Sequence, residues 1–503
     1  MFGGNGVDNG VLNKVDIKAS MSLKFGTSGV RGLVTEMNDR ECFLYASAYV
    51  DVLLSRCEVK EVCLSGDFRF STPRILKAIQ AAIESKGLKA IHCGFIPTPA
   101  LAAYAMSLNA GSIMVTGSHI PDDRNGIKFY MPWGEILKAE EVEISKRYTQ
   151  LKESGEDPDV DKLGALLKLP EDLKMTNIAE RQFVERYTDV FADDSLKGLR
   201  VVFYQHSTVG REVMPEILEK LGAEVVKVGW SDTFVPVDTE AVAEPEKLAA
   251  WVKEHGADLL MSADGDGDRP LVVDDQGKVI RGDLLGLIAS SALGADSISL
   301  PISCNTALEE AKVVKRINRT RIGSPFVIEA MNVDRDDFEC VVGYEANGGF
   351  LTGSVIQPKF GHGILAALPT RDAVLPVVSV LMAAKEKGVK VSGLVADLPA
   401  RYVTSGIIRD IPMEQGAALV EDLNVGGEKK VSELFSKNFG ACDSIDKTDG
   451  IRMTFKSRDI VHYRPSGNAP EFRCYTESNS EENAIALNEK AMVTLKEILP
   501  KYA

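Results

Sequence analysis

The chain has 503 residues, of which 45% are hydrophobic and 26% are charged. This balance excludes a disordered chain, a collagen-like fibre and a small disulfide scaffold, and at ~150 residues per domain the length indicates three or four domains. The 58 Lys and Arg residues stand against 73 Asp and Glu, which gives a net charge of −15. So acidic a chain is a poor candidate for binding nucleic acid or an anionic membrane. A small anionic substrate remains compatible with it if a pocket gathers Arg and Lys.

The cysteines and the apolar segments predict a cytoplasmic protein. No two cysteines form a C-x-x-C pair, so we expect reduced thiols rather than disulfides. The first ten residues are rich in Gly and Asn and lack the apolar centre of a signal peptide. The longest apolar stretch, residues 284–302, contains Gly294 and Asp296, which predicts a buried helix and a strand instead of a membrane span. The eight cysteines are Cys42, Cys57, Cys63, Cys93, Cys304, Cys340, Cys442 and Cys474.

The first unit, residues 1–170, is predicted to alternate apolar strands with amphipathic helices. Ile75, Ile79 and Ile83 fall on one face of a helix that Gly87 ends. The last strand of the unit runs into the polar loop GSHIPDD, and the charged, proline-containing segment 153–172 is the expected linker to the next unit. The predicted strands lie at 61–65, 90–93 and 112–116 and the predicted helix at 73–86, with a further helix before the last strand.

Two further units, residues 171–280 and 281–390, repeat this order. The first of them ends in a strand followed by the loop ADGDGDR, and the second in a strand followed by GYEANGG. Ligands of α/β sheets bind at the carboxyl ends of strands, so the three loops suggest one site assembled from three domains. The predicted strands lie at 200–204, 224–228, 258–261, 297–301 and 339–342, and the predicted helices at 212–221, 246–254, 283–293, 306–314 and 325–331.

Residues 391–503 form a unit of a different kind. Strands such as 451–455 and 471–475 alternate with helices such as 482–498, which predicts an α+β domain. This unit carries a fourth polar loop, YRPSGNAPEFR, at residues 463–473. The predicted fold class is therefore α/β, with three similar mixed α/β domains followed by a C-terminal α+β domain and an active site in the central cleft.

The loop DGDGDR carries three carboxylates, those of Asp264, Asp266 and Asp268. The glycines between them let the backbone curl, so that all three can converge on a hard cation such as Mg²⁺ or Ca²⁺. An EF-hand does not fit, because Arg269 and Asp275 stand where that loop needs Gly and Glu. A solvated acidic turn is the alternative, but three carboxylates without a nearby counter-charge would repel one another.

A second candidate is Ser118, which follows a strand and precedes His119. A serine in this place can be a nucleophile or can carry a phosphoryl group. The alternative is a serine that caps a helix, but Pro121 and the pair Asn125-Gly126 predict a turn there. No G-x-S-x-G motif is present, and no catalytic triad can be assigned from the sequence.

The two remaining loops have the residue types that bind a sugar phosphate. Glu345 only accepts hydrogen bonds whereas Asn347 both donates and accepts, so together they can hold neighbouring hydroxyls of a polyol. A plain Asn-Gly turn is the alternative. Arg464 and Ser466, with Arg473 in the strand that follows, are the parts of a phosphate cradle, for which a surface turn is the alternative.

Together, the four loops resemble those of the α-D-phosphohexomutases, which include phosphoglucomutases, phosphomannomutases and phospho-N-acetylglucosamine mutases. The segment KFGTSGVRG at residues 24–32 is similar to the N-terminal motif of that family, and TGSH, DGDGDR, GYEANG and RPSGNAPEFR follow in the family's order. The resemblance spans nearly the whole chain. The loops EANGG and RPSGNAPE are most similar to those of bacterial phosphomannomutases.

The resemblance implies an isomerase with a phosphorylated serine and a Mg²⁺ ion. Ser118 would carry the phosphoryl group and share Mg²⁺ with Asp264, Asp266 and Asp268. The other implied roles are phosphoryl contacts and proton transfer for Arg31, His119 and Lys128, a place beside the metal for Arg269, sugar hydroxyls for Glu345 and Asn347, and the second phosphate for Arg464, Ser466, Gly467, Asn468 and Arg473.

The implied reaction moves a phosphate between C6 and C1 of a hexose through a hexose bisphosphate, with mannose phosphates as the expected pair. Glucose and N-acetylglucosamine phosphates are the alternatives within the family. A metal-dependent sugar phosphatase and a non-catalytic sugar-phosphate binding protein are the alternatives outside it. Several members of the family carry a Lys and a His in the third domain, whereas Ser303 and residues 323–325 stand near those places here. We therefore assign no acid or base in the third domain, and the oligomeric state is left open.

Overall fold

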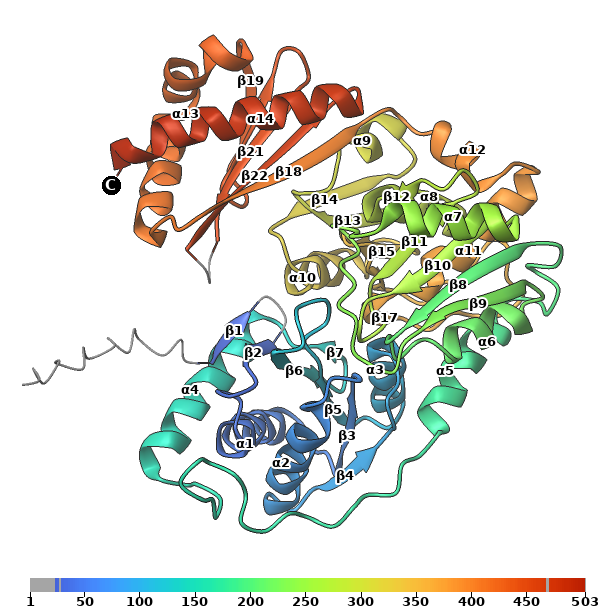
Figure 1. The fold of residues 1–503 in the computed structure, drawn as a ribbon, viewed down its shortest axis with the longest axis vertical. Coiled ribbons are helices and arrows are strands. Elements are labelled where there is room, and N and C mark those ends of the chain that lie inside the picture. Colours follow the sequence, from blue (N-terminus) through green and yellow to red (C-terminus); the bar gives the residue numbers. More distant parts are fainter. Residues whose placement is uncertain (1–22, 27–28, 467–469, 503) are drawn as a thin grey trace, which may run out of the picture.

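The computed structural model describes residues 23–502 except 27–28 and 467–469. The strands among these residues form four sheets, one in each of four successive units. The units follow one another around the molecule, and the fourth lies opposite the first (Figure 1). Three mixed sheets and one antiparallel sheet, each packed with helices, confirm the predicted fold class.

The sheet of the first unit has the strand order β1-β2-β6-β5-β3-β4, with β7 paired to β6. Strand β3 runs parallel to β4 and β5, whereas β6 runs antiparallel to β5. The loop that contains Ser118 therefore joins a central strand to an antiparallel neighbour. The elements are β1 (Lys24–Gly26), β2 (Gly29–Leu33), α1 (Asp39–Arg56), β3 (Glu61–Gly66), α2 (Thr72–Ser85), β4 (Lys89–His92), α3 (Thr98–Ser107), β5 (Gly111–Val115), β6 (Arg124–Met131), β7 (Gly134–Glu135) and α4 (Lys138–Ser154).

The second unit has the strand order β12-β11-β10-β8-β9. Strand β8 is parallel to β9 and β10, and β10 and β11 form an antiparallel hairpin. The DGDGDR loop is the turn of that hairpin. The elements are α5 (Ile178–Thr188), β8 (Arg200–His206), α6 (Val213–Lys220), β9 (Glu224–Trp230), α7 (Pro245–His255), β10 (Leu259–Ala263), β11 (Pro270–Asp274) and β12 (Val279–Ile280).

The third unit has the strand order β14-β13-β15-β16-β17. The sequence predicted no strand between its helices 306–314 and 325–331, which is wrong, because β14 lies there. Four of its five residues, RINRT, are polar, and it lies at the edge of the sheet, so no apolar run marks it. The elements are α8 (Gly282–Leu293), β13 (Ser297–Pro301), α9 (Ala307–Ala311), β14 (Arg316–Thr320), α10 (Ser324–Asp334), β15 (Val341–Tyr344), β16 (Phe350–Thr352), β17 (Leu368–Asp372), α11 (Val374–Lys387) and α12 (Val391–Ala396).

The fourth unit has an antiparallel sheet of order β18-β22-β21-β20-β19. Alternate residues of β20 are buried, as expected for a sheet covered on one face. Helix α13 is broken at Gly427, which has a φ of 55°. The elements are β18 (Tyr402–Arg409), α13 (Met413–Phe439), β19 (Cys442–Asp446), β20 (Ile451–Phe455), β21 (Ile460–Pro465), β22 (Glu471–Ser478), α14 (Glu481–Ile498) and a 3₁₀ helix (Leu499–Tyr502).

The first three sheets share one topology. The orders β6-β5-β3-β4, β11-β10-β8-β9 and β16-β15-β13-β14 are equivalent, with three parallel strands and one antiparallel neighbour in each. The serine loop, the DGDGDR loop and the GYEANGG loop occupy the same place in this topology, after the strand that precedes the antiparallel neighbour. The sequence suggested this similarity through the order of elements alone.

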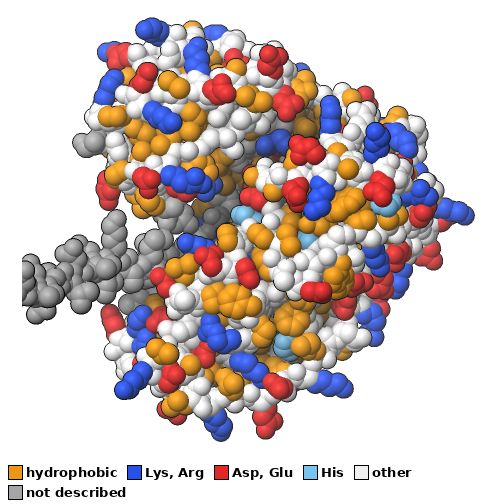
Figure 2. All heavy atoms as spheres, in the orientation of Figure 1, with side chains coloured by type: hydrophobic (Ala, Val, Ile, Leu, Met, Phe, Trp, Pro, Cys, Tyr) orange, Lys and Arg blue, Asp and Glu red, His pale blue; other side chains and the backbone are white. Residues whose placement is uncertain are grey.

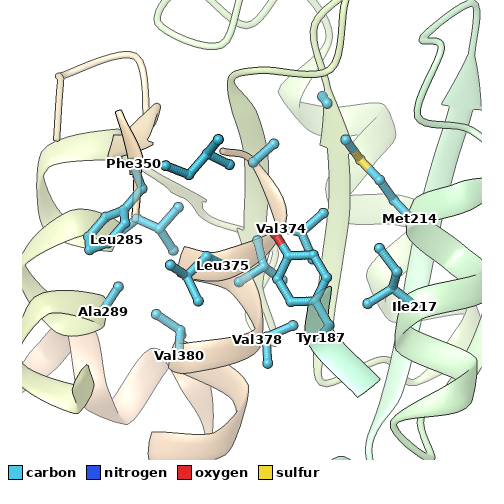
Figure 3. Close-up of a cluster of buried hydrophobic side chains, with 14 of the residues drawn as sticks. Tyr187, Met214, Ile217, Leu285, Ala289, Phe350, Val374, Leu375, Val378 and Val380 are labelled. Carbon is cyan, nitrogen blue, oxygen red and sulfur yellow. The ribbon is translucent and has the colours of Figure 1, made fainter. Parts of the chain in front are cut away.

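One hydrophobic cluster spans the first three units, so they share a core. It includes Leu101 and Tyr104 of α3 in the first unit. Figure 3 shows another part of it, where side chains of α5 and α6 lie beside side chains of α8 and α11, among them Tyr187, Met214, Leu285 and Leu375.

The fourth unit has a hydrophobic cluster of its own and contacts the third unit through polar groups. Nε of Arg401 donates to Oε1 of Glu477 at 2.6 Å, and the backbone N–H of Thr306 donates to the same oxygen at 3.0 Å. Helix α12 belongs to the shared core, since Val391 and Leu394 are part of that cluster. The domain limits at residues 170, 280 and 390 stay predictions.

All eight cysteines lie in the described part of the chain and are free thiols. Within the same part, no helix has the length and apolar character needed to cross a membrane. The cytoplasmic location stays a prediction.

Buried His462 on β21 gives the fourth unit a pH-dependent stability. Burial and the charge of Arg452 lower the pKa of His462 to about 4, below the value of ~6.5 in an unfolded chain. The unfolded state therefore binds more protons as the pH falls from 6.5 toward 4, and the stability that is complete above pH 6.5 is lost over this range. At pH 5 we expect the free energy of unfolding to be lower by about 2 kcal/mol.

Calorimetric melting temperatures at pH 7 and pH 5 measure this effect. The variant His462→Gln should lose part of the decrease, whereas a His362→Gln variant, at an exposed position, should keep all of it. An equal decrease in both variants would contradict the assignment.

Candidate active site

The loop between β10 and β11 brings three carboxylates together. Side-chain oxygens of Asp264, Asp266 and Asp268 lie within 4.8 Å of one another, and all three residues are fully buried. Gly267 has a φ of 69°, and a Cβ on Gly265 would lie 2.7 Å from a carbonyl oxygen of the serine loop. One glycine is thus required by left-handed backbone and the other by the close passage of a neighbouring loop.

The oxygens of these carboxylates fall into two sets. Oδ2 of Asp266 accepts hydrogen bonds from Lys128 and Thr98, and Oδ2 of Asp268 accepts one from Lys128. Oδ1 of Asp266 and Oδ1 of Asp268 are buried and have no hydrogen-bond partner among the residues that the structure describes. Two carboxylate oxygens that accept no hydrogen bond, beside a third carboxylate, suit a hard cation such as Mg²⁺, so the triad can hold a metal ion.

Counter-charges reach the triad from other units. Nζ of Lys128, in the first unit, lies 2.6 Å from Asp266 and 2.7 Å from Asp268, and Nε of Arg371, in the third unit, lies 3.0 Å from Asp268. The expectation that no counter-charge is near was therefore wrong. It left out these two residues of other units and also Arg269, the next residue in the chain, whose Nε lies 3.7 Å from Oδ1 of Asp268. Although burial raises the pKa of Asp268, Arg371 and Lys128 hold it below its ordinary value. Burial and repulsion from Asp266 and Asp268 raise the pKa of Asp264 to about 8, which a bound divalent cation would oppose.

Ser118 follows β5 with its hydroxyl directed at the triad. Its Oγ donates a hydrogen bond to Oδ2 of Asp264 at 2.5 Å. The residue is fully buried and has a φ of 60°, a left-handed conformation that a non-glycine residue seldom adopts. Its backbone N–H donates to Oγ1 of Thr116 at 2.7 Å. The turn predicted after Ser118 in place of a helix is confirmed, since β6 begins at Arg124.

Arg69 organises the serine loop from the loop after β3. Its side chain is fully buried, and the ring of Phe234 from the second unit covers the guanidinium at 4.0 Å. A network of this density can hold the strained backbone at Ser118. The guanidinium donates to Asp67 and to the carbonyl oxygens of Ser118, Ile120, Pro121 and Arg124, at 2.6–3.2 Å.

Arg269 fixes the protonation of His119. Nη1 of Arg269 lies 3.0 Å from Nδ1 of His119. Because a guanidinium only donates, Nδ1 accepts and the ring proton lies on Nε2. Burial and the charge of Arg269 lower the pKa of His119 to about 3, so the imidazole is neutral. Burial and Arg269 also lower the pKa of Arg31 to about 10.

The loop between β15 and β16 is both a turn and a part of the cleft wall. Oδ1 of Asn347 accepts from the N–H of Gly349 at 2.9 Å, and Nδ2 lies 3.4 Å from Oε2 of Glu345. The hydroxyl of Thr239, in the second unit, donates to the carbonyl oxygen of Asn347 at 2.8 Å. The backbone therefore forms the Asn-Gly turn that was the alternative interpretation. The side chains of Glu345 and Asn347 also line the cleft.

Arg464 and Arg473 lie opposite each other on β21 and β22. Nε of Arg464 lies 2.9 Å from Oδ2 of Asp449. The same oxygen accepts a hydrogen bond from the N–H of Ile322, in the third unit, at 3.0 Å. Asp449 therefore connects the arginine pair of the fourth unit to the third unit.

A cleft of about 510 Å³ joins these residues, and its walls come from all four units. Figure 2 shows the surface hollowed between the fourth unit and the first. Ser118, Lys128 and the three Asp residues are buried next to this cleft. Gly467 and Asn468 lie outside the described residues. The other predicted site residues line the cleft, namely Arg31, His119, Arg269, Glu345, Asn347, Arg464, Ser466 and Arg473.

Sequence reasoning missed Arg69, Thr98 and Arg371. Arg69 stands in a polar loop after a predicted strand, and the rule that selected the other loops would have found it. Thr98 and Arg371 act on carboxylates of another unit, and nothing in their own sequence neighbourhood indicates those contacts.

Gly117 admits Arg69 to the serine loop. A Cβ at residue 117 would lie 2.6 Å from Cζ of Arg69. We expect Gly117→Ala to lower the free energy of unfolding by about 1–3 kcal/mol, because a buried guanidinium has to move. Gly393→Ala in α12 is the matched control, since its nearest neighbour atom is 3.5 Å away. Urea denaturation measures both variants, and equal stabilities would contradict the packing role of Gly117.

Three domain families match the chain in order. They are the alpha/beta/alpha domains I, II and III of phosphoglucomutase/phosphomannomutase, at residues 22–155, 181–277 and 282–402. A phosphomannomutase from Salmonella muenchen is 40% identical over 97% of this chain and 98% of its own length. One from Sinorhizobium fredii is 43% identical over 94% of this chain and 99% of its own. Relatives called phosphoglucosamine mutase match at 27 to 32% identity.

Among solved structures, a putative phosphomannomutase from Thermus thermophilus has the same fold. Its TM-score is 0.72 at 19% identity, over 95% of this chain and 100% of that one. The matched domains cover more than half of the chain, and the Salmonella and Sinorhizobium relatives extend the similarity over the fourth unit. The chain belongs to the phosphoglucomutase/phosphomannomutase family of phosphohexomutases.

Proposed function

We propose that this protein interconverts mannose 6-phosphate and mannose 1-phosphate through a phosphoserine at Ser118 and a bisphosphorylated sugar. One observation carries the proposal, namely that a single cleft joins a nucleophile and a second anion site. Ser118 Oγ lies 2.5 Å from Oδ2 of Asp264 beside the cleft, and Arg464 and Arg473 form a pair on its fourth-unit wall. A sugar with a phosphate at each end needs both places.

Ser118 is the phosphoryl carrier of this reaction. The bond between Oγ and phosphorus breaks as a hydroxyl oxygen of the bound mannose phosphate forms the new bond to phosphorus. The bisphosphate then reorients and returns the phosphoryl group of its other end to Ser118. Such transfer depends mainly on positioning and on charge stabilisation, which is what a rigid, buried serine loop and a charged cleft provide.

The charges of the chain suit a transferring phosphoryl group. Arg31 and Arg269 line the cleft, and guanidinium groups bind phosphate oxygens through charge-assisted hydrogen bonds. Lys128 donates to Oδ2 of Asp266 and to Oδ2 of Asp268. The Oδ1 atoms of both residues therefore remain available to a cation. We assign this place to Mg²⁺, which when bound supplies charge neutralisation at the phosphoryl oxygens.

The sugar ring and the phosphate that is not transferred have separate partners. We assign the hydroxyls at C3 and C4 to Glu345 and Asn347, and the phosphate that is not transferred to Arg464, Ser466 and Arg473, together with Gly467 and Asn468. Hydroxyls at C3 and C4 are available in both orientations of a hexose bisphosphate. A metal-dependent phosphatase would need no second phosphate site, and the comparisons give it no support.

The names of the Salmonella and Sinorhizobium relatives favour mannose over the other hexoses. Mannose and glucose differ only at C2, which the assigned contacts do not reach. We therefore expect both 1-phosphates to react, with mannose preferred and kcat/KM values within about two orders of magnitude. N-acetylglucosamine 1-phosphate should react far more slowly, because its amide needs space and partners of its own.

The values of kcat/KM for the 1-phosphates of mannose, glucose, glucosamine and N-acetylglucosamine test the proposed function. If an amino sugar proved the best substrate, the assignment to mannose would fall and a sister activity of the family would replace it. Release of inorganic phosphate without isomerisation would overturn the mutase assignment itself.

Ser118 should carry a phosphate in the purified protein. Mass spectrometry should find part of the protein heavier by ~80 Da, with the modification on the peptide that contains Ser118. Ser118→Ala should lose mutase activity by orders of magnitude, because the phosphoryl group then has no carrier. Ser85→Ala, which removes a hydroxyl bonded only within α2, is the control and should keep full activity. A Ser118→Ala variant of normal activity would disprove the mechanism.

A further inference from the structure

We propose that Arg371 is a positioning residue that couples the metal site to the sugar loop. Its guanidinium joins the carboxylate of Asp268, a predicted metal ligand, to the carboxylate of Glu345, a predicted sugar ligand. The proposal rests on the proposed function for the roles of these two carboxylates.

Arg371 makes contacts that reach all of the first three units. Nε donates to Oδ2 of Asp268 at 3.0 Å, and Nη1 lies 3.2 Å from Oε2 of Glu345. Nη1 also donates to Oγ of Ser324 at 2.8 Å, and that hydroxyl donates to Oε1 of Glu135, on β7 of the first unit, at 2.7 Å. The side chain of Arg371 is 2% exposed, so these bonds are shielded from water.

The sugar loop is built to admit this side chain. A Cβ on Gly349 would lie 2.4 Å from Cδ of Arg371. The last glycine of GYEANGG is therefore the residue over which the arginine passes to reach Asp268. Since Glu345 stands in the same short loop, a displacement of Arg371 would move the loop and one carboxylate of the triad together.

Arg371 determines which oxygens of the two carboxylates are available. It occupies Oδ2 of Asp268 together with Lys128, whereas Oδ1 of Asp268 accepts no hydrogen bond within the described part of the chain and lies 3.7 Å from Nε of Arg269. It likewise occupies Oε2 of Glu345, so that Oε1 is the remaining oxygen. A lysine has one donor centre and cannot make this forked contact, whereas a guanidinium stays charged and presents its donors in a fixed plane.

The experiment compares Arg371→Lys with the wild type and with Arg319→Lys in the full-length protein. Arg319 is the control, because it is a partly buried arginine of the same unit, with a side chain 15% exposed, whose partners are Glu309 and three carbonyl oxygens away from the cleft. Titration calorimetry of dephosphorylated protein with Mg²⁺ gives the dissociation constant, and steady-state kinetics give kcat and KM.

We expect Arg371→Lys to weaken Mg²⁺ binding by about tenfold or more and to lower kcat/KM by a similar factor, as is typical when a residue that orients metal ligands is changed. Arg319→Lys should lower the melting temperature without changing either quantity. Unchanged Mg²⁺ affinity in folded Arg371→Lys, or equal losses in both variants, would overturn the proposal.

Glu345→Gln tests the coupling even if Arg371→Lys does not fold. This variant leaves Asp268 intact but removes the negative charge of Glu345. Arg371 then pairs with one carboxylate instead of two, so we expect the dissociation constant of Mg²⁺ to change at least threefold. An unchanged dissociation constant would overturn the coupling. Absence of mutase activity in the wild type would instead refute the proposed function, and the Mg²⁺ titrations would still decide whether Arg371 orients the triad.

Discussion

The rest of the structure depends on the burial of three carboxylates at one point. Asp264, Asp266 and Asp268 are fully buried within a few ångströms of one another, and charge of that density is strongly destabilising unless it is paired. The cations that pair with it are Arg269 of the same loop, Lys128 from the first unit and Arg371 from the third. The three units therefore have to meet at this cluster, and the hydrophobic core that they share holds them there. Oδ1 of Asp266 and Oδ1 of Asp268 accept no hydrogen bond within the described part of the chain, and this feature allows the cluster to hold a metal ion.

Topology explains why the reactive loops converge on that cluster. Each of the first three sheets turns into its antiparallel neighbour at an equivalent place, and each of these turns carries one of the polar loops. The same architectural position thus supplies a serine, a carboxylate triad and the pair Glu345 and Asn347. Close approach of the loops is possible because small residues stand where they cross. The side chain of Arg69 packs directly against Gly117, and the side chain of Arg371 packs directly against Gly349.

Most of the fold and much of the candidate site could be predicted from the sequence, and the exceptions have physical reasons. Apolar periodicity located most helices and strands within a few residues, and strand-end loops pointed to Ser118 and to the Asp triad. Strand β14 was missed because it is an edge strand with one apolar residue among five and therefore has no apolar run. Arg371 and Thr98 were missed because their partners belong to other units, and a contact between distant segments leaves no pattern near either one. The inferred lack of a counter-charge was also wrong, because Lys128 and Arg371 come from other units and the adjacent Arg269 was not counted.

The junction of the fourth unit differs in kind from the other junctions. The first three units share an apolar core, whereas the fourth meets the third through groups such as Glu477 with the N–H of Thr306 and Asp449 with the N–H of Ile322. Separating an apolar core exposes surface to water at a cost that grows with its area, but water can replace hydrogen bonds at a polar junction with little net change. The fourth unit can therefore move relative to the others more easily than they can move among themselves. Asp449 lies at this junction and also pairs with Arg464, so a phosphate that engages Arg464 competes for a contact that holds the units together. A bisphosphorylated sugar that has to turn within the cleft needs such a wall, one that binds a phosphate and can open without disturbing the buried charges opposite it.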